Sequence, residues 1–124
     1  MSPAVGPYSP VRRVGDWVVT SGQVGLATDE AGTSALVAGG TVPELRQALG
    51  NVAEVLAIEG ATLPDVVKTT VFLVDMGDFA ALNEVWVEFF TDGERRPARS
   101  AVAVAALPVG ARVEVEAWAY APVV

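Results

Sequence analysis

The chain has 124 residues, of which 52% are hydrophobic and 19% charged, and its formal net charge is −7. This length and balance are typical of one globular domain spanning residues 1–124. An acidic chain with only eight scattered basic residues disfavours a nucleic-acid partner, because such binding depends on clustered lysine and arginine. The chain has no cysteine and no histidine, which excludes disulfides, thiolate nucleophiles and the commonest general base.

Segments for targeting, membrane insertion and metal binding are not apparent. The first residues carry neither the basic nor the apolar region of a signal peptide, and no apolar run reaches membrane-spanning length. We therefore expect a cytoplasmic protein with no membrane partner. Only carboxylates remain as metal ligands, and no Asp/Glu spacing resembles a calcium loop, so no metal site is expected.

The N-terminal third predicts strands and a loop. Val11–Val14 reads as a short strand, Gly15-Asp16 as a tight turn, and residues 17–24 alternate as a second strand. The small and polar residues of segment 27–40 predict a loop.

A long helix is predicted next. The spacing of Thr41 and Glu44 predicts a capping box, and Gly60 is placed to end the helix. The apolar residues between them recur at helical spacing: Leu45, Leu49, Val52 and Leu56.

The second half predicts a strand, a helix and two further strands. Residues 66–74 form a β-branched run that is apolar on both faces, and Asp78 is placed to begin a second helix. One apolar stripe of that helix reads as core or interface: Phe79, Leu82, Trp86, Phe89 and Phe90. Residues 100–106 and 112–120 predict two closing strands joined by a turn at 108–110. The order β-β-α-β-α-β-β favours an α+β fold with both helices on one face of a mixed sheet.

The most specific chemistry lies in these last two strands. Arg99 offers a planar fork of donors that fits a carboxylate, and Glu114 and Glu116 share one strand face. We expect the strands to form one β-hairpin that joins the arginine to the carboxylates. The alternatives are a surface salt bridge for Arg99, and a solvated face or neutralisation of Arg99 or Arg112 for the glutamates.

In order along the chain, seven segments resemble the RidA/YjgF family, also described as reactive intermediate deaminases or L-PSP endoribonucleases. The segments are Gly6-Pro7-Tyr8-Ser9, Ser21-Gly22-Gln23, residues 67–73 (VKTTVFL), Asp78-Phe79-Ala80, Asn83-Glu84, Pro97-Ala98-Arg99-Ser100 and residues 113–117 (VEVEA). The resemblance covers nearly the whole chain. It implies a chorismate-mutase-like fold, a homotrimer with clefts between subunits, and no cofactor.

The resemblance also implies roles for individual residues. Arg99 would bind the substrate carboxylate and Glu114 would hold the attacking water, with Tyr8 as a further catalytic group. The substrate-binding residues would be Ser21, Gly22, Asn83 and Ala101. Ala101 stands where many relatives carry cysteine, so thiol-dependent reactions are not available to this chain.

The implied activity is hydrolytic deamination of reactive 2-imino and 2-enamino acids, such as 2-aminoacrylate, to 2-keto acids and ammonia. One alternative is a regulatory trimer that binds small carboxylates without turnover. An endoribonuclease is a weaker alternative, because the chain is acidic and has no basic stripe.

Overall fold

A computed structural model describes residue 4 and residues 6–124. Five strands form the main sheet in the order β1-β2-β7-β5-β6, and two strands form a small second sheet. The strands are β1 Val11–Val14, β2 Trp17–Thr20, β3 Leu26–Thr28, β4 Ser34–Leu36, β5 Val66–Leu73, β6 Ala98–Ala103 and β7 Val113–Tyr120. The helices are α1 Thr41–Ile58 and α2 Phe79–Phe89, with 3-10 turns at Leu63–Asp65, Met76–Asp78 and Pro108–Gly110.

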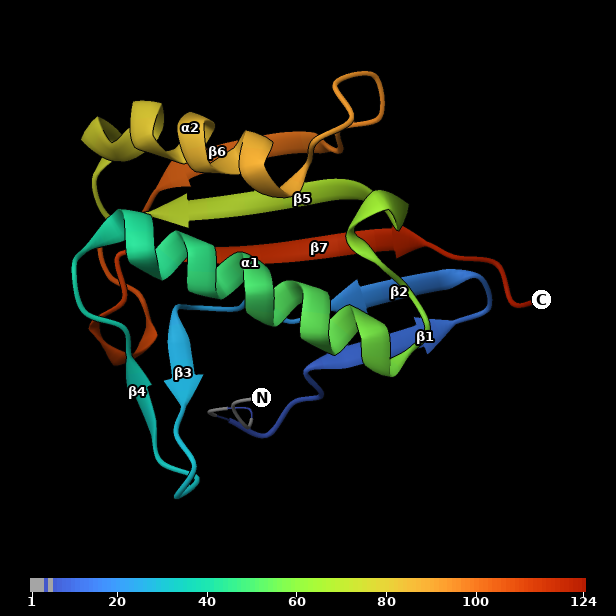
Figure 1. Ribbon diagram of the computed structural model, residues 1–124, viewed down its shortest axis with the longest axis horizontal. Helices are drawn as coiled ribbons and strands as arrows, with labels where there is room; N and C mark the ends of the chain where they lie inside the picture. Colours follow the sequence, from blue (N-terminus) through green and yellow to red (C-terminus); the bar gives the residue numbers. More distant parts are fainter. Residues whose placement is uncertain (1–3, 5) are drawn as a thin grey trace.

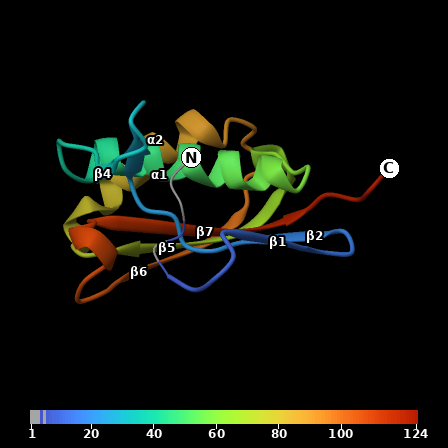
Figure 2. The same ribbon diagram turned by 90° about the horizontal axis from the view of Figure 1, so that it is seen from below.

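Both helices lie on one face of the five-stranded sheet, and no helix of the described residues covers the other face (Figures 1 and 2). Strands β5 and β6 run parallel, whereas the other pairs of this sheet are antiparallel. A parallel pair needs a crossover connection, which α2 supplies. The predicted α+β class, with a mixed sheet and two helices on one face, is confirmed.

The predicted hairpin between the last two strands is wrong. Strand β5 lies between β6 and β7 and pairs with both of them. The predicted turn exists as the 3-10 turn Pro108–Gly110, but it belongs to the longer connection between the two strands. Strands adjacent in sequence pair in most proteins, yet here β7 enters the sheet between β2 and β5. Pairing across the sheet therefore decided the topology.

Two local predictions in the first half also need correction. Segment 27–40 contains β4 and most of β3, which pair with each other, so it is not simply a loop. The strand predicted at 17–24 ends at Thr20, after which only Gln23 bridges to β7. Strands of three residues carry too few alternations to be recognised by period.

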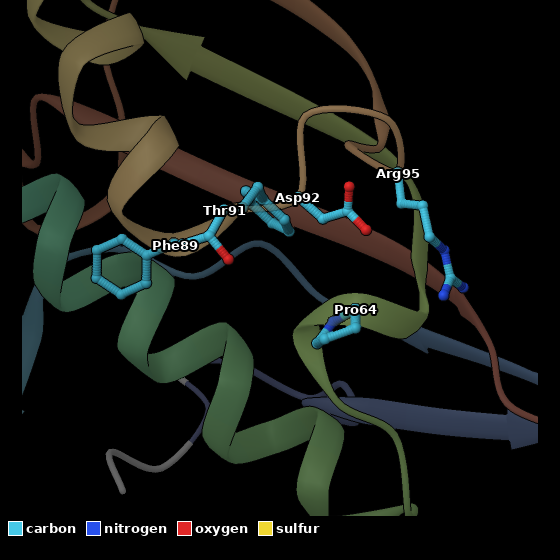
Figure 3. Close-up of a pocket in the computed structure, with 6 residues that line it drawn as sticks. Pro64, Phe89, Thr91, Asp92 and Arg95 are labelled. Atoms are coloured by element: carbon cyan, nitrogen blue, oxygen red, sulfur yellow. The ribbon is translucent and has the colours of Figure 1, made fainter.

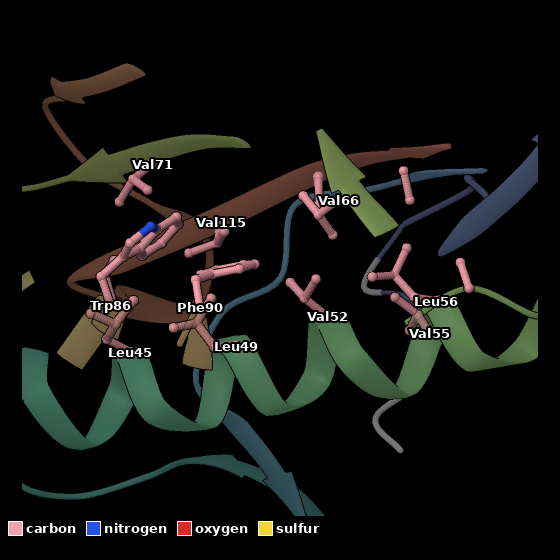
Figure 4. Close-up of a cluster of buried hydrophobic side chains, with 14 of the residues drawn as sticks. Leu45, Leu49, Val52, Val55, Leu56, Val66, Val71, Trp86, Phe90 and Val115 are labelled. Carbon is pink, nitrogen blue, oxygen red and sulfur yellow. The ribbon is translucent and has the colours of Figure 1, made fainter. Parts of the chain in front are cut away.

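The hydrophobic core lies between the helices and the sheet (Figure 4). All four apolar positions predicted on the long helix are at most 1% exposed: Leu45, Leu49, Val52 and Leu56. They pack against alternate residues of β5 and β7, among them Val71 and Val115, and against Trp86 and Phe90 of the α2 segment. Side chains alternate along a strand, so the residues of β7 between these buried ones face away from the helices.

The start of α1 differs from the predicted capping box, whereas its end at Gly60 agrees with the prediction. The N-cap is Gly40, and Thr41 and Glu44 form no capping box. Instead, Thr41 Oγ1 donates to Asp78 Oδ2 at 2.6 Å, and Glu44 Oε1 accepts from the main-chain N–H of Arg112 at 2.8 Å. These side chains join the start of α1 to the residue before α2 and to the residue before β7.

At the other end, Gly60 has a φ of +78° and donates to the carbonyl of Ala57, while Ala61 donates to that of Leu56. This pair of hydrogen bonds is a Schellman motif, which requires a left-handed residue and therefore favours glycine.

Candidate active site

Arg99 lies on the edge strand β6, on the face that carries the helices. Its register partner on β5 is the buried Thr69. Arg99 Nη2 donates a 2.7 Å hydrogen bond to Oδ1 of Asn83 on α2. The guanidinium carbon lies 5.0 Å from the centre of the Trp86 ring and 5.5 Å from that of Phe79. At these distances cation–π attraction stabilises the charge.

The Arg99 guanidinium is held in place without being neutralised. Burial lowers its pKa, although a guanidinium stays protonated in proteins. Within residues 4 and 6–124, no carboxylate lies within 4.0 Å of it. Only one of its five N–H donors has a hydrogen-bond partner in this part of the chain, and the group lines a hollow of about 400 Å³. Open donors on a planar fork are what a carboxylate ligand requires.

Two predicted binding residues accompany Arg99. Asn83 contacts it directly, as described above. Ala101 follows two residues along β6, on the same face, and packs against the hydrophobic core. The sequence therefore identified two neighbours of the arginine. Asn83 lies on the predicted second helix, whereas the strand of Ala101 pairs with β5 and not in the predicted hairpin.

The aromatic rings beneath Arg99 were predicted only as core or interface. Trp86 and Phe90 are buried with ring centres 4.8 Å apart, whereas Phe79 is 41% exposed. The spacing of Phe79, Asn83 and Trp86, at i, i+4 and i+7, places all three on one helix face. That spacing was visible in the sequence, but nothing in it showed that the face meets an arginine.

Glu114 lies on β7 and points to the helix-free face, together with Glu116 as predicted. Burial, and to a smaller extent the charge of Glu116, raises the pKa of Glu114. Arg112 does not neutralise Glu114, because its guanidinium pairs with Asp78 at 3.5 Å. A carboxylate with a raised pKa is a stronger general base, provided that it is ionised at the working pH.

An irregular segment after β2 passes close to Glu114. The main chains of Gln23 and Val115 exchange two hydrogen bonds, of 2.8 and 2.9 Å. The last β2–β7 pair is Val19 with Trp118, and the bridge is Gln23 with Val115. Four residue steps on one strand therefore match three on the other, and the extra residue is a β-bulge. Gly22 sits in the bulge, and a Cβ atom there would lie 2.6 Å from Cδ of Glu114. The site thus requires glycine for close approach.

The N-terminal segment lies beside this bulge. Ser21 Oγ donates to the carbonyl of Ser9 at 2.6 Å, and its main-chain N–H donates to that of Pro10. Tyr8 is 47% exposed and lines a small pocket of about 30 Å³ together with Gly22. The structure therefore brings Tyr8 and Ser21 next to the segment of Gly22, which in turn approaches Glu114. The Ser21 hydroxyl anchors the main chain there.

The two groups of predicted site residues are separated within one chain. Arg99 lies on the helix-covered face, and Glu114 lies on the opposite face with β5 between their strands. Two strand spacings amount to about 10 Å, and the thickness of the sheet adds to this separation. An acid of three or four carbons cannot touch both side chains of one chain.

A separate, smaller hollow of about 70 Å³ lies where α2 meets the turn before β5 (Figure 3). Its lining includes Pro64, Phe89, Asp92 and Arg95. Among the residues that the structure describes, no group of three or more His, Cys, Asp or Glu side chains could hold a metal ion. In the same part of the chain, no helix is long and apolar enough to cross a bilayer.

The fold and the two clusters define a small α+β protein with two helices on one face of a mixed sheet. A sequence profile of the family described as Endoribonuclease L-PSP matches residues 1–121. The chain belongs to this family, the same family as RidA and YjgF.

Individual relatives support this assignment. The chain is 47% identical over 116 residues to the 2-iminobutanoate/2-iminopropanoate deaminase of Mus musculus, covering 94% of this chain and 82% of that protein. The solved RidA of Psychrobacter sp. PAMC 21119 is 41% identical with a TM-score of 0.84, covering 96% of this chain and 92% of that one. Escherichia coli TdcF, solved with bound serine, is 35% identical with a TM-score of 0.85, covering 96% and 91%.

Proposed function

We propose that this protein hydrolyses 2-imino acids, and their 2-enamino tautomers, to 2-keto acids and ammonia, without a cofactor, at sites between subunits of a homotrimer. The observation that carries the proposal is that the two candidate catalytic groups, Arg99 and Glu114, lie on opposite faces of the sheet and cannot act together within one chain. Arg99 has open donors on one face of the sheet, and Glu114 has a raised pKa on the other. The deaminase name of the Mus musculus relative supports the reaction.

A head-to-tail arrangement of copies would bring the two groups together. Arg99 lies on an edge strand, so one subunit can present it to the helix-free face of the next. Such a heterologous contact generates a ring when its rotation closes. Three subunits would then form three equivalent clefts, each with Arg99 from one subunit and Glu114 from its neighbour.

The composition of the helix-free face supports the proposal that another subunit covers it. Several of its large apolar side chains are exposed in the single chain: Trp17, Val102, Trp118 and Tyr120. The ring of Trp17 packs edge-on against those of Trp118 and Tyr120, which extends the apolar surface across β2 and β7. Apolar patches of this kind mark protein–protein contacts.

The proposed reaction needs positioning and one base. Arg99 binds the substrate carboxylate and thereby orients the imine carbon. Ionised Glu114 accepts a proton from a water as the water oxygen adds to that carbon, giving a carbinolamine. Protonation of nitrogen then releases ammonia and leaves the keto acid. The balance is one imine and one water consumed for each keto acid and ammonia formed.

The remaining predicted residues have supporting roles. Tyr8 can donate to or accept from the water or the substrate, since a phenol does both. Gly22 leaves room for the Glu114 carboxylate, and Ser21 fixes the segment that contains Tyr8. Asn83 orients Arg99 through its hydrogen bond, and Ala101 provides a small side chain on the same strand.

One alternative function uses the same arginine without turnover. The serine bound to TdcF shows that this relative holds a small carboxylate ligand, so a sensor of small acids is the second candidate. The family name points to endoribonuclease activity, but a net charge of −7 disfavours RNA binding.

The experiment is release of keto acid and ammonia from an imine that an amino-acid oxidase generates in the assay, with the oligomeric state measured by light scattering. We expect acceleration by the trimer and its loss in Arg99→Ala. Binding of keto acids without acceleration for several imines would overturn the deaminase in favour of the sensor. A second test mixes Arg99→Ala with Glu114→Gln subunits: between-subunit sites predict partial recovery in mixed trimers, and no recovery contradicts shared sites.

A further inference from the structure

A second arginine, Arg96, also lines the hollow around Arg99. The lining of this hollow comprises Asn83, Trp86, Val87, Arg96, Pro97 and Arg99. Two arginines therefore face one hollow that has no aspartate or glutamate in its lining. This is unexpected in a chain with 15 acidic and eight basic residues.

Arg96 is oriented by the main chain and is not paired with an acid. Its Nε donates a 2.9 Å hydrogen bond to the carbonyl of Phe90, just after α2. In the described part of the chain, no carboxylate lies within 4.0 Å of either Arg96 or Arg99. Two like charges at one hollow repel each other, and a ligand with two negative charges would relieve that repulsion.

The adjacent Arg95 provides a contrast. Arg95 lines two other hollows, one with Asp92 and one with Asp65, and Arg96 also lines the hollow with Asp65. Figure 3 shows Arg95 on the same loop as Asp92. The two consecutive arginines differ at the hollow around Arg99, which Arg96 lines and Arg95 does not.

From this arrangement we infer that the preferred substrates are 2-imino diacids, with Arg99 binding the carboxylate next to the imine carbon and Arg96 binding the carboxylate of the side chain. The inference rests on the proposed deaminase function and specifies its substrate class. Three residues of extended chain place the Cα atoms of Arg96 and Arg99 at most about 10 Å apart. Both long side chains line the same hollow, so a diacid of four or five carbons is short enough to lie between them.

The reaction is the same imine hydrolysis as above. 2-Iminosuccinate and water would give oxaloacetate and ammonia, and the second carboxylate takes no part in bond making. Arg96 would therefore act on substrate selection, through a charge-assisted hydrogen bond formed only with diacids. A site built around such a bond discriminates against ligands that lack the partner group.

The test compares kcat/KM for 2-iminosuccinate, generated by an aspartate oxidase, with that for 2-iminobutanoate, generated by an amino-acid oxidase. The proteins are the wild-type trimer, Arg96→Gln and the matched control Arg95→Gln. We expect Arg96→Gln to lower kcat/KM for the diacid about tenfold, to change that for the monoacid less than about twofold, and Arg95→Gln to change neither. Circular dichroism checks that the variants fold, and Arg96→Lys should retain part of the preference.

Equal effects of Arg96→Gln on the two substrates, or a wild-type preference for the monoacid, would overturn the inference while leaving the deaminase intact. Absence of turnover with both substrates would instead overturn the proposed function. Calorimetric binding of oxaloacetate and 2-oxobutanoate separates these cases. Tighter oxaloacetate binding that is lost in Arg96→Gln would support a diacid-binding hollow even without turnover, and equal binding would contradict it.

Discussion

Arg13 and Arg99 are both half-buried arginines, but their surroundings differ. Arg13 donates two hydrogen bonds to the carbonyl of Glu59, at 2.6 and 3.1 Å, one to Gly15 at 3.0 Å and one to Ala121 at 2.8 Å. Arg99 donates one hydrogen bond, to an amide on α2, and otherwise lies over two aromatic rings.

The difference separates a structural arginine from a candidate binding arginine. Arg13 joins the end of α1, the β1–β2 turn and the segment after β7, and its charge complements the negative end of the helix dipole. Nearly all of its donors are used by its own chain. Arg99 is orientated by its neighbours while most of its donors remain open, which is the condition for binding an external carboxylate.

Replacing Arg99 by lysine should have the strongest effect on activity. Lysine keeps the positive charge but loses the planar fork, so we expect kcat/KM for imine hydrolysis to fall roughly 100-fold or more. The free energy of unfolding should change little. Initial rates of ammonia release and urea denaturation measure the two quantities, and retention of activity by the lysine variant would contradict two-point carboxylate binding.

Glu114→Gln should lower kcat by about 100-fold, because the amide cannot accept the proton from water. Keto-acid release under saturating imine measures this. Ionisation of Glu114 is disfavoured in the folded chain, so its contribution to stability decreases as the pH rises through its folded-state pKa. The glutamine variant should lack that dependence, and a variant with full activity would show that another group is the base.

Gly22→Ala tests the close approach of the bulge to Glu114. The added Cβ displaces the carboxylate, and we expect an activity loss of roughly 10- to 100-fold in a folded protein. Gly50→Ala is the matched control, because a Cβ at that helical position meets nothing within 4 Å. It should leave activity unchanged and stabilise the fold by about 0.5–1 kcal/mol. Equal activities of the two variants would count against the assigned role of Gly22.

Arg13→Ala should lower stability and leave activity unchanged, which is the opposite of the result expected for Arg99. The loss of four hydrogen bonds to carbonyls, in a partly exposed site, should lower the free energy of unfolding by about 2 kcal/mol. Activity of the remaining folded protein should stay near that of the wild type. The exposed Arg12, on the same strand, is the control, and Arg12→Ala should change stability by less than about 0.5 kcal/mol.

Glu116→Gln should have the smallest effect, a shift in pH dependence. The charge of Glu116 contributes to the raised pKa of Glu114. Removing that charge lowers this pKa, so the acid limb of the activity profile should move to lower pH. A profile of kcat/KM against pH measures the shift. An unchanged acid limb, or one moved to higher pH, would mean that another group controls it.

Local patterns predicted the main elements well. The apolar spacing from Leu45 to Leu56 is sufficient for an amphipathic helix, and Gly60 is the residue that a left-handed helix end requires. The β-branched run at 66–74 became β5. The prediction that Glu114 and Glu116 share a face also held, since alternation is a property of the strand itself.

Predictions that depended on residues distant in the sequence failed more often. Thr41 and Glu44 have the spacing of a capping box, but Asp78 and Arg112 offered them other hydrogen bonds. Those partners are 37 and 68 residues away, so no local pattern contains them. The assumed hairpin failed for the same reason, because the preference for pairing adjacent strands does not account for β5.

The amino-acid sequence was sufficient for the helices, the longer strands and the α+β class, because these depend on side-chain chemistry and short-range periodicity, and it named candidate site residues that stay predictions. Tertiary structure alone determined that β7 lies between β2 and β5, and that Arg99 and Glu114 point to opposite faces of one sheet. Pairing of distant strands fixes which face each side chain occupies, and this separation makes a site shared between subunits the arrangement to test.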